Sequence, residues 1–315
     1  MKYIYVIIFL GFTAINCSDE DGRLFPSGKD IDWFIVKDSD DELEHLRYSI
    51  YEKNGITVCY TTKLGEQDRG EDAFGDRIIH EEFLSPEYWI TKADNISYTC
   101  PRNREYIKNG LLFIQDRIIP FLPSGVYPRC ILLVEDLYER KGRDRWMRDV
   151  YLGSMALVVS NVGKLHAMTG VDRRAFELDI YTCLWFKHIQ ANYASTLVKF
   201  YEISENSVVW PAENLNREIY DHWVSERVLS NSSDRVPYKA HWNGYGFLLC
   251  NPERTTSDGY ITPTKEQDVR SFIRAVLEYD DDEFAKKYEG KEGETLLIGK
   301  YRLIKDIVEN VKAKK

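Results

Sequence analysis

The order of the apolar segments constrains the fold of this 315-residue chain more than any other feature. Short runs of apolar and β-branched residues predict strands at 56–62, 130–134 and 155–160. Helical spacing of apolar residues predicts a long helix over 176–203 and two further helices toward the C-terminus. Strands early and helices late predict the α+β class. The length suits one large domain or two small ones.

Several helix ends and connections are also marked in the sequence. Gly55 ends a predicted helix over 40–53, because glycine readily adopts the left-handed conformation that closes a helix. Thr264, followed three residues later by a glutamine, predicts a capping box at the start of a C-terminal helix. The charged stretch 63–103 predicts a loop-rich excursion, and the acidic run 280–282 predicts a solvated loop between two helices.

The N-terminus predicts export. Lys2 precedes the apolar run 3–14, which is too short to cross a bilayer of about 30 Å and is typical of a signal peptide. The run ends close to Cys17. The sequence therefore predicts a signal peptide at 1–16.

The cysteine at the end of this segment resembles the bacterial lipobox, in which that residue is diacylated and becomes the mature N-terminus. Asn16 departs from the lipobox pattern, which has a small residue there, and an ordinary secretory signal is the alternative. The acidic residues after Cys17 resemble the signal that some Gram-negative lipoproteins use to reach the outer face of the outer membrane. The predicted organisation is then a lipidated tether over 17–35 and one folded domain over 36–315.

Charge and cysteine content limit the partners and the redox state. A net charge of −9, without a basic cluster to neutralise phosphates, argues against nucleic acid. Five cysteines remain after Cys17, an odd number that cannot pair completely within one chain. Four of them lie in apolar runs and are predicted to be buried free thiols. A disulfide that involves Cys100 is the alternative in an oxidising compartment.

The segments, in their order and spacing, resemble the lipoprotein zinc metallohydrolases that are associated with TonB-dependent substrate import in Gram-negative bacteria. The resemblance covers about 36–312 and implies a zincin-like metallopeptidase domain, with a small mixed sheet, a long active-site-type helix and C-terminal helices. The segments that carry it are NGITVCY, RCILLV, MALVVSNV, LWFKHIQAN, GYGFLLC, TKEQDVRSFIRAVLEY and GKYRLIKDIVENV.

In that family the long helix carries HExxH, because residues four apart on a helix can reach one zinc ion while the glutamate activates water. The resemblance places the two histidines at Leu184 and His188 and the glutamate at Trp185, and a further acidic ligand at Ser271. Only His188 can bind a metal. The resemblance therefore implies a domain without catalytic residues, and we expect no zinc or other cofactor.

The retained architecture with an erased active site predicts a non-catalytic surface lipoprotein that binds a peptide or glycan beside a TonB-dependent importer. Tryptophan, tyrosine and histidine offer large contact surfaces to such ligands. The predicted aromatic cleft consists of Trp185, His188, His241, Trp242 and Tyr245.

Two other interpretations stay open. An active zinc metallopeptidase with relocated ligands needs His188, His222 and His241 to converge on one metal, with Asp221 or Glu218 beside them. A purely structural subunit of an importer complex needs an exposed apolar patch elsewhere.

Overall fold

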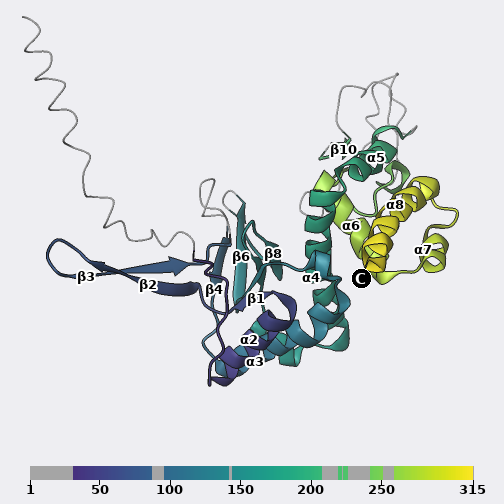
Figure 1. Cartoon of the computed structure of the whole chain (residues 1–315). Coiled ribbons are helices and arrows are strands. Elements are labelled where there is room, and N and C mark those ends of the chain that lie inside the picture. Colours follow the sequence, from purple (N-terminus) through teal and green to yellow (C-terminus); the bar gives the residue numbers. More distant parts are fainter. Residues whose placement is uncertain are drawn as a thin grey trace, which may run out of the picture. The chain divides into compact units, whose positions relative to one another are not determined.

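The computed structural model describes residues 31–86, 96–141, 144–207, 219–221, 223–225, 242–250 and 259–314. Cys17, the predicted signal peptide and most of the predicted tether lie outside these residues. The chain divides into two compact units, one formed by 1–35 with 63–83 and the other by 36–62 with 84–315. The fold is mixed α+β, as the sequence predicts (Figure 1).

The smaller unit contains a β-hairpin, formed by β2 (Lys63–Glu71) and β3 (Arg77–Phe83), which pair antiparallel. The Asp72 side chain accepts hydrogen bonds from the backbone of Phe74 and Asp76 and thereby closes the turn. The prediction of an irregular loop is wrong for this segment. Its charged residues lie on an exposed two-stranded ribbon, where no apolar alternation is needed.

The larger unit is built on a four-stranded sheet in the order β1 (Thr57–Cys59), β5 (Cys130–Leu133), β9 (Leu157–Val159) and β8 (Val150–Leu152). The first three strands are parallel, and β8 runs antiparallel at the edge. Every residue of β1, β5 and β9 is buried, which explains their continuous apolar sequences.

A second sheet in the larger unit has three antiparallel strands: β4 (Ile96–Thr99), β6 (Asp136–Lys141) and β7 (Asp144–Met147). The β4 strand lies inside the stretch predicted to be irregular. A short two-stranded ribbon is formed by β10 (Trp223–Ser225) and β11 (Gly259–Ile261).

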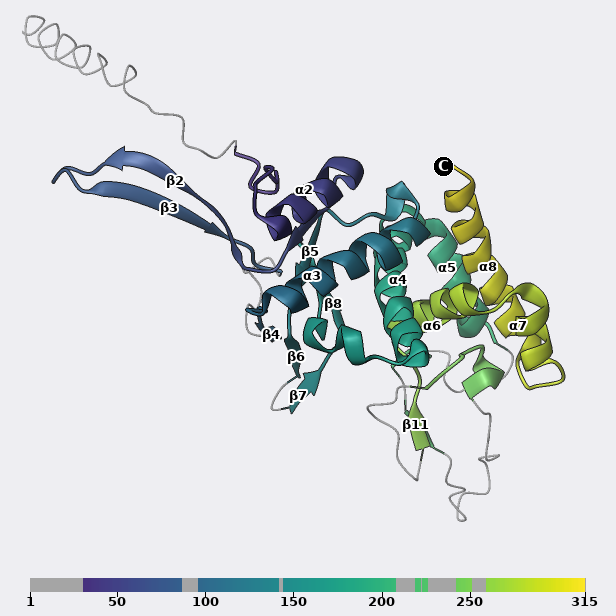
Figure 2. The ribbon, with the colours of Figure 1, turned by 90° about the horizontal axis from the view of Figure 1, so that it is seen from below.

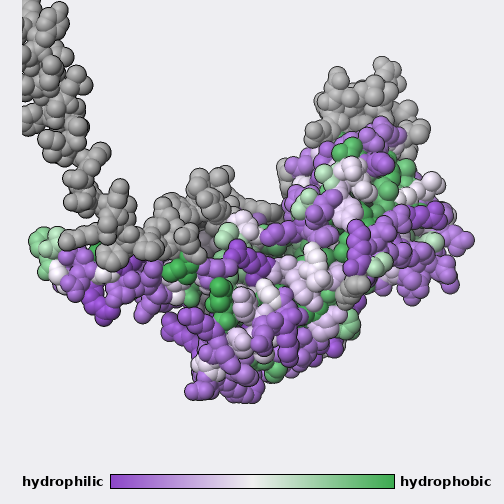
Figure 3. All heavy atoms as spheres, viewed as in Figure 1, coloured by the Kyte–Doolittle hydropathy of each residue, from purple (hydrophilic) through white to green (hydrophobic). Residues whose placement is uncertain are grey.

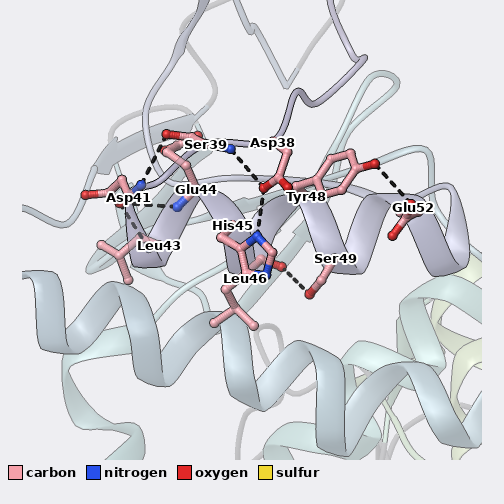
Figure 4. Close-up of polar contacts among 10 residues, drawn as sticks. All are labelled: Asp38, Ser39, Asp41, Leu43, Glu44, His45, Leu46, Tyr48, Ser49 and Glu52. Carbon is pink, nitrogen blue, oxygen red and sulfur yellow. Dashed lines mark hydrogen bonds and ion pairs between the residues drawn. The ribbon is translucent and has the colours of Figure 1, made fainter.

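The first helix, α2 (Glu42–Asn54), begins at a network of short polar side chains (Figure 4). Asp41 accepts hydrogen bonds from the backbone of Leu43 and Glu44, and a hydrogen bond from Arg104 lowers the pKa of its carboxyl group. His45 lies 2.7 Å from Asp38, and their hydrogen bond lowers the pKa of Asp38. Gly55, at φ 69°, ends the helix as predicted.

Helix α3 (Arg104–Phe113) continues directly as a π-helical turn, η2 (Ile114–Ile118). Three short 3-10 turns connect the larger elements: η3 (Ile119–Phe121), η4 (Ser124–Val126) and η5 (Val162–Ala167). Phe113 of α3 stacks on Phe176 of the next long helix, which joins the two into one core.

The predicted long helix over 176–203 is two helices, α4 (Gly170–Asn192) and α5 (Ala194–Glu205). Tyr193 interrupts it with φ −129° and ψ 36°, a conformation outside the helical range. Apolar residues continue at short intervals on both sides of the break, so apolar spacing alone does not reveal it. Helix α4 contacts β8 of the sheet on one side and the later helix α6 (Lys265–Glu278) on the other (Figures 1 and 2).

Three helices, and not two, close the chain: α6 (Lys265–Glu278), α7 (Asp281–Tyr288) and α8 (Glu294–Ala313). The predicted capping box at Thr264 is present. The acidic run predicted as a solvated loop begins α7, because Asp280 and Glu283 form a second capping box. Figure 3 shows a largely hydrophilic outer surface over these helices, whose apolar sides face the core.

Two thiols meet in the larger sheet. Cys59 of β1 and Cys130 of β5 are buried, and their Sγ atoms lie 4.0 Å apart. Cys183 is a buried free thiol, whereas Cys100 and Cys250 are partly exposed. Free buried thiols at three of the four predicted positions agree with the prediction, and Cys250 is less buried than predicted.

Candidate functional site

The structure does not bring the four predicted metal-site positions together. Leu184 and Trp185 are 2% and 1% exposed and lie in the main hydrophobic core. Ser271 lines a pocket on α6, and its hydroxyl donates to the backbone oxygen of Asp268. His188 lines a different pocket. When HExxH is aligned with 184–188, its first two positions, Leu184 and Trp185, therefore lie in the core.

The His188 pocket is a cavity of about 530 Å³ between the end of α4, η4 and the C-terminal end of α8. His188 is partly exposed there, with its ring 5.9 Å from that of Tyr193 and 6.1 Å from that of Trp185. Neither a cysteine nor a carboxylate is among the other residues that line this cavity. His188 thus has no second metal ligand among the described residues of its pocket.

The predicted aromatic cleft is not formed by the described residues. Trp185 is in the main core, and Tyr245 is 2% exposed in a separate aromatic cluster with Ile219, Tyr220, Phe247 and Tyr260. Trp242 is half-buried, and its ring meets that of Tyr260 edge-on at 5.6 Å. The prediction of ligand contact is wrong for Trp185 and Tyr245, because aromatic residues at these spacings serve the core. His241, and with it His222 and Glu218 of the relocated zinc site, lie outside the described residues.

The second pocket, which we call the arginine pocket, lies between α4, α6 and the chain that leads from β7 into β8. It is a cavity of about 480 Å³, within the range of small-molecule sites. Its charged and polar lining comes from α4, from α6 and from residues 148 and 149, and comprises Arg148, Asp149, Asp179, Thr182, Gln267, Arg270, Ser271 and Arg274. Met147, Val150 and Leu249 add apolar surface.

Helical spacing explains how this pocket is built. Asp179 and Cys183 are four residues apart on α4, and Arg270 and Arg274 are four apart on α6, so each pair projects from one face of its helix. The two faces meet: Arg274 forms an ion pair with Asp179, and Arg270 Nη1 donates to Cys183 Sγ at 3.2 Å. None of these four residues was predicted from the sequence to form a site. The repeated four-residue spacing of charged residues was the signal that could have found them.

Burial and neighbouring charges set the protonation in this pocket. Burial raises the pKa of Asp179, and the Arg274 guanidinium opposes this rise. Burial also raises the pKa of the Cys183 thiol, against the effect of Arg270, so the thiol stays neutral at pH 7. A neutral thiol that is 4% exposed is a poor nucleophile. The pocket is therefore suited to binding and not to covalent catalysis by cysteine.

Two polar atoms of the lining are buried without a hydrogen-bond partner in the described part of the chain. They are the Thr182 hydroxyl oxygen and Arg270 Nε. The other two Arg270 nitrogens have partners: Nη1 bonds to Cys183, and Nη2 lies 2.8 Å from Glu266. The guanidinium carbon lies 4.9 Å from the centre of the Phe186 ring. Native structures rarely leave buried donors unmatched, which makes these two atoms candidates for contact with a ligand group.

The donor set of this pocket does not fit zinc. Asp179 and Cys183 have the spacing of two metal ligands on a helix, but each is already bonded to a guanidinium. A dication between them would lie beside fixed positive charges. Across the described ranges, no group of three or more His, Cys, Asp and Glu side chains is placed to hold a metal ion.

A further cluster of polar side chains, apart from the two pockets, is inaccessible to solvent. Lys300 of α8 and Asp268 of α6 form an ion pair at 2.6 Å, with both side chains 0% exposed, and the Tyr220 hydroxyl donates to the same carboxylate at 2.9 Å. The rings of Phe200 and Phe247 enclose the ammonium group, with their centroids 4.6 and 4.8 Å from Nζ. No substrate can reach these groups in this conformation, so we assign them a structural role.

Comparison of the chain with models of protein families, with curated proteins and with solved structures found no match. None of the helices in the described part of the chain is long and apolar enough to cross a membrane.

Proposed function

We propose that this chain is a lipid-anchored, surface-exposed protein of the outer membrane of a Gram-negative bacterium, which binds a ligand without catalysing a reaction. The arginine pocket carries this proposal, since it combines an open cavity with polar groups that lack partners, on the helix where the resemblance expects catalytic residues. The proposed partner is a TonB-dependent importer, and the proposed ligand class is peptide or glycan.

The zincin-like assignment of the larger unit belongs to the same proposal. It is supported by a small mixed sheet that precedes a long helix, with further helices at the C-terminal end. The residues at the expected ligand positions do not converge, which favours a domain that has lost its metal. The alternative of an active zinc metallopeptidase depends on His188, His222 and His241, of which only His188 lies in the described residues.

Metal content separates these two proposals. We expect the purified protein, after dialysis against a weak chelator, to contain far less than one equivalent of zinc by elemental analysis, because the described residues include no group of three or more His, Cys, Asp and Glu side chains placed to hold a metal ion. About one equivalent of zinc, lost in His188→Ala, would overturn the proposal and support the relocated site. Lys187→Ala, at an exposed position beside it, is the matched control.

The lipid anchor is tested separately at Cys17. We expect Cys17→Ser to abolish incorporation of a labelled fatty acid and to move the protein from the membrane fraction to the soluble fraction, because the thiol that receives the diacylglycerol is lost. Cys100→Ser, which changes a partly exposed thiol of the folded domain, should leave the fractionation unchanged. A Cys17→Ser protein that still carries labelled fatty acid and sediments with membranes would contradict the lipobox.

A further inference from the structure

We infer that the arginine pocket binds the carboxylate of an organic acid with an apolar body, such as the C-terminus of a peptide. This inference rests on the proposed function and names the ligand group that the pocket selects. It starts from the lining, where three arginines gather in a chain whose net charge is −9. Each arginine pairs with one carboxylate: Arg148 with Glu139, Arg270 with Glu266 and Arg274 with Asp179. Of these three carboxylate partners, Glu266 is the most exposed, at 55%.

Arg270 provides the main recognition group. Its Nε is buried and without a partner, and its Nη2 bonds to Glu266, whose side chain is 55% exposed. An ion pair with such an exposed carboxylate contributes little free energy, so a ligand can replace Glu266 readily. Nε and Nη2 lie on one edge of the guanidinium, the edge that binds both oxygens of a carboxylate.

Thr182 and the apolar part of the lining define the rest of the ligand. The Thr182 hydroxyl is buried without a partner on the α4 side of the cavity and can donate to a carboxylate oxygen. Met147 and Leu249 are exposed apolar side chains that line the same cavity and supply contacts for an apolar group. A small inorganic anion would leave this apolar surface uncovered.

The aspartates of the lining do not compete for the guanidinium of Arg270. Asp179 is held by Arg274, and Asp149 accepts a hydrogen bond from Asn161 at 2.6 Å. Arg148 bonds to Glu139 at 2.8 Å. Both aspartates are thus matched to other partners, and Arg270 keeps its Nε donor for a ligand.

The test is calorimetric titration of the full chain with N-acetylleucine, with N-acetyl-trileucine and with the C-terminal amide of each. We expect both acids to bind at least about tenfold more tightly than their amides, since a charge-assisted bidentate pair is lost in the amide. Tighter binding of the peptide acid identifies a peptide C-terminus as the source of the carboxylate, and equal binding of the two acids identifies a small organic acid.

Substitution of Arg270 locates the site. Arg270→Gln should weaken binding of the acids by about tenfold or more and leave the amides unchanged, and Arg270→Lys should fall between, because lysine keeps the charge and loses the planar fork. Arg302→Gln, at an exposed position of α8 outside both pockets, is the matched control. Circular dichroism verifies that each variant is folded.

Three results overturn the inference: acids and amides that bind equally, no binding of any probe, or acid binding that Arg270→Gln leaves intact. None of them changes the zinc content, on which the non-catalytic function is tested. Conversely, one equivalent of zinc, together with tighter binding of the acids than of the amides, would overturn the non-catalytic function and would still support the carboxylate site. The two proposals can therefore fail independently.

Discussion

Replacing Lys300 with methionine should lower the free energy of unfolding by about 3–5 kcal/mol, the cost of removing one partner from a buried ion pair. Asp268 would be left as a carboxylate at 0% exposure. The Tyr220 hydroxyl would still donate to its Oδ2, and Oδ1 has no hydrogen-bond partner among the described residues. Urea unfolding followed by circular dichroism at pH 7 measures this loss.

The double variant Asp268→Leu/Lys300→Met is the control. It removes both charges and fills the space with apolar side chains, so we expect it to be more stable than Lys300→Met alone by about 2 kcal/mol or more. A single variant that loses less than about 1 kcal/mol, or a double variant no better than the single one, would contradict a structural role for the pair.

The loss of stability in Lys300→Met should also depend on pH. Burial raises the pKa of Asp268 in the folded protein, and Lys300 opposes this rise, so Lys300→Met raises the folded-state pKa further. A carboxyl group whose folded pKa exceeds its unfolded pKa stabilises the protein below the unfolded pKa, and this stability is lost as pH rises through the folded pKa. The difference between wild type and variant should therefore be smaller at pH 4 than at pH 7.

Completing the HExxH sequence with Leu184→His and Trp185→Glu should destabilise the protein by about 4 kcal/mol or more and should not create zinc binding. Both side chains are buried in the main core, whereas His188 faces its own pocket. The substitution removes a large apolar side chain and places an unpaired carboxyl group among apolar neighbours. Thermal unfolding and elemental analysis measure the two effects.

Lys187→Glu is the matched control, since it introduces the same carboxylate two residues away, on the exposed face of α4. We expect its stability to change by less than about 0.5 kcal/mol. A folded double variant that binds one equivalent of zinc would show that the helix can present 184 and 185 to a metal, and that the resemblance was aligned correctly.

The sequence predicted the elements whose residues carry a periodic or capping signal. The buried strands β1, β5 and β9 were predicted because they are apolar throughout, and α2 and α6 because Gly55 and Thr264 mark their ends. The hairpin of β2 and β3 and helix α7 were missed because charged residues dominate them. Local charge indicates exposure, and exposure does not exclude regular structure.

The candidate site was harder to predict because it depends on which face of α4 meets α6. Residues 184 and 185 fall on the core side of α4, and residues 179 and 183 fall on the side that contacts α6. A helix turns by about 100° per residue, so an alignment shifted by one position changes which side chains share a face. The position of the helix in the chain could therefore be predicted from the sequence, but which of its faces meets the core could not.

The adjacent thiols of Cys59 and Cys130 have a consequence for the order of events during maturation. Once β1 and β5 have paired, both sulfur atoms are sealed from solvent in the sheet, so an oxidant can reach them only while the chain is still unfolded. Their oxidation state therefore indicates whether β1 and β5 paired before or after the chain was exposed to an oxidising environment.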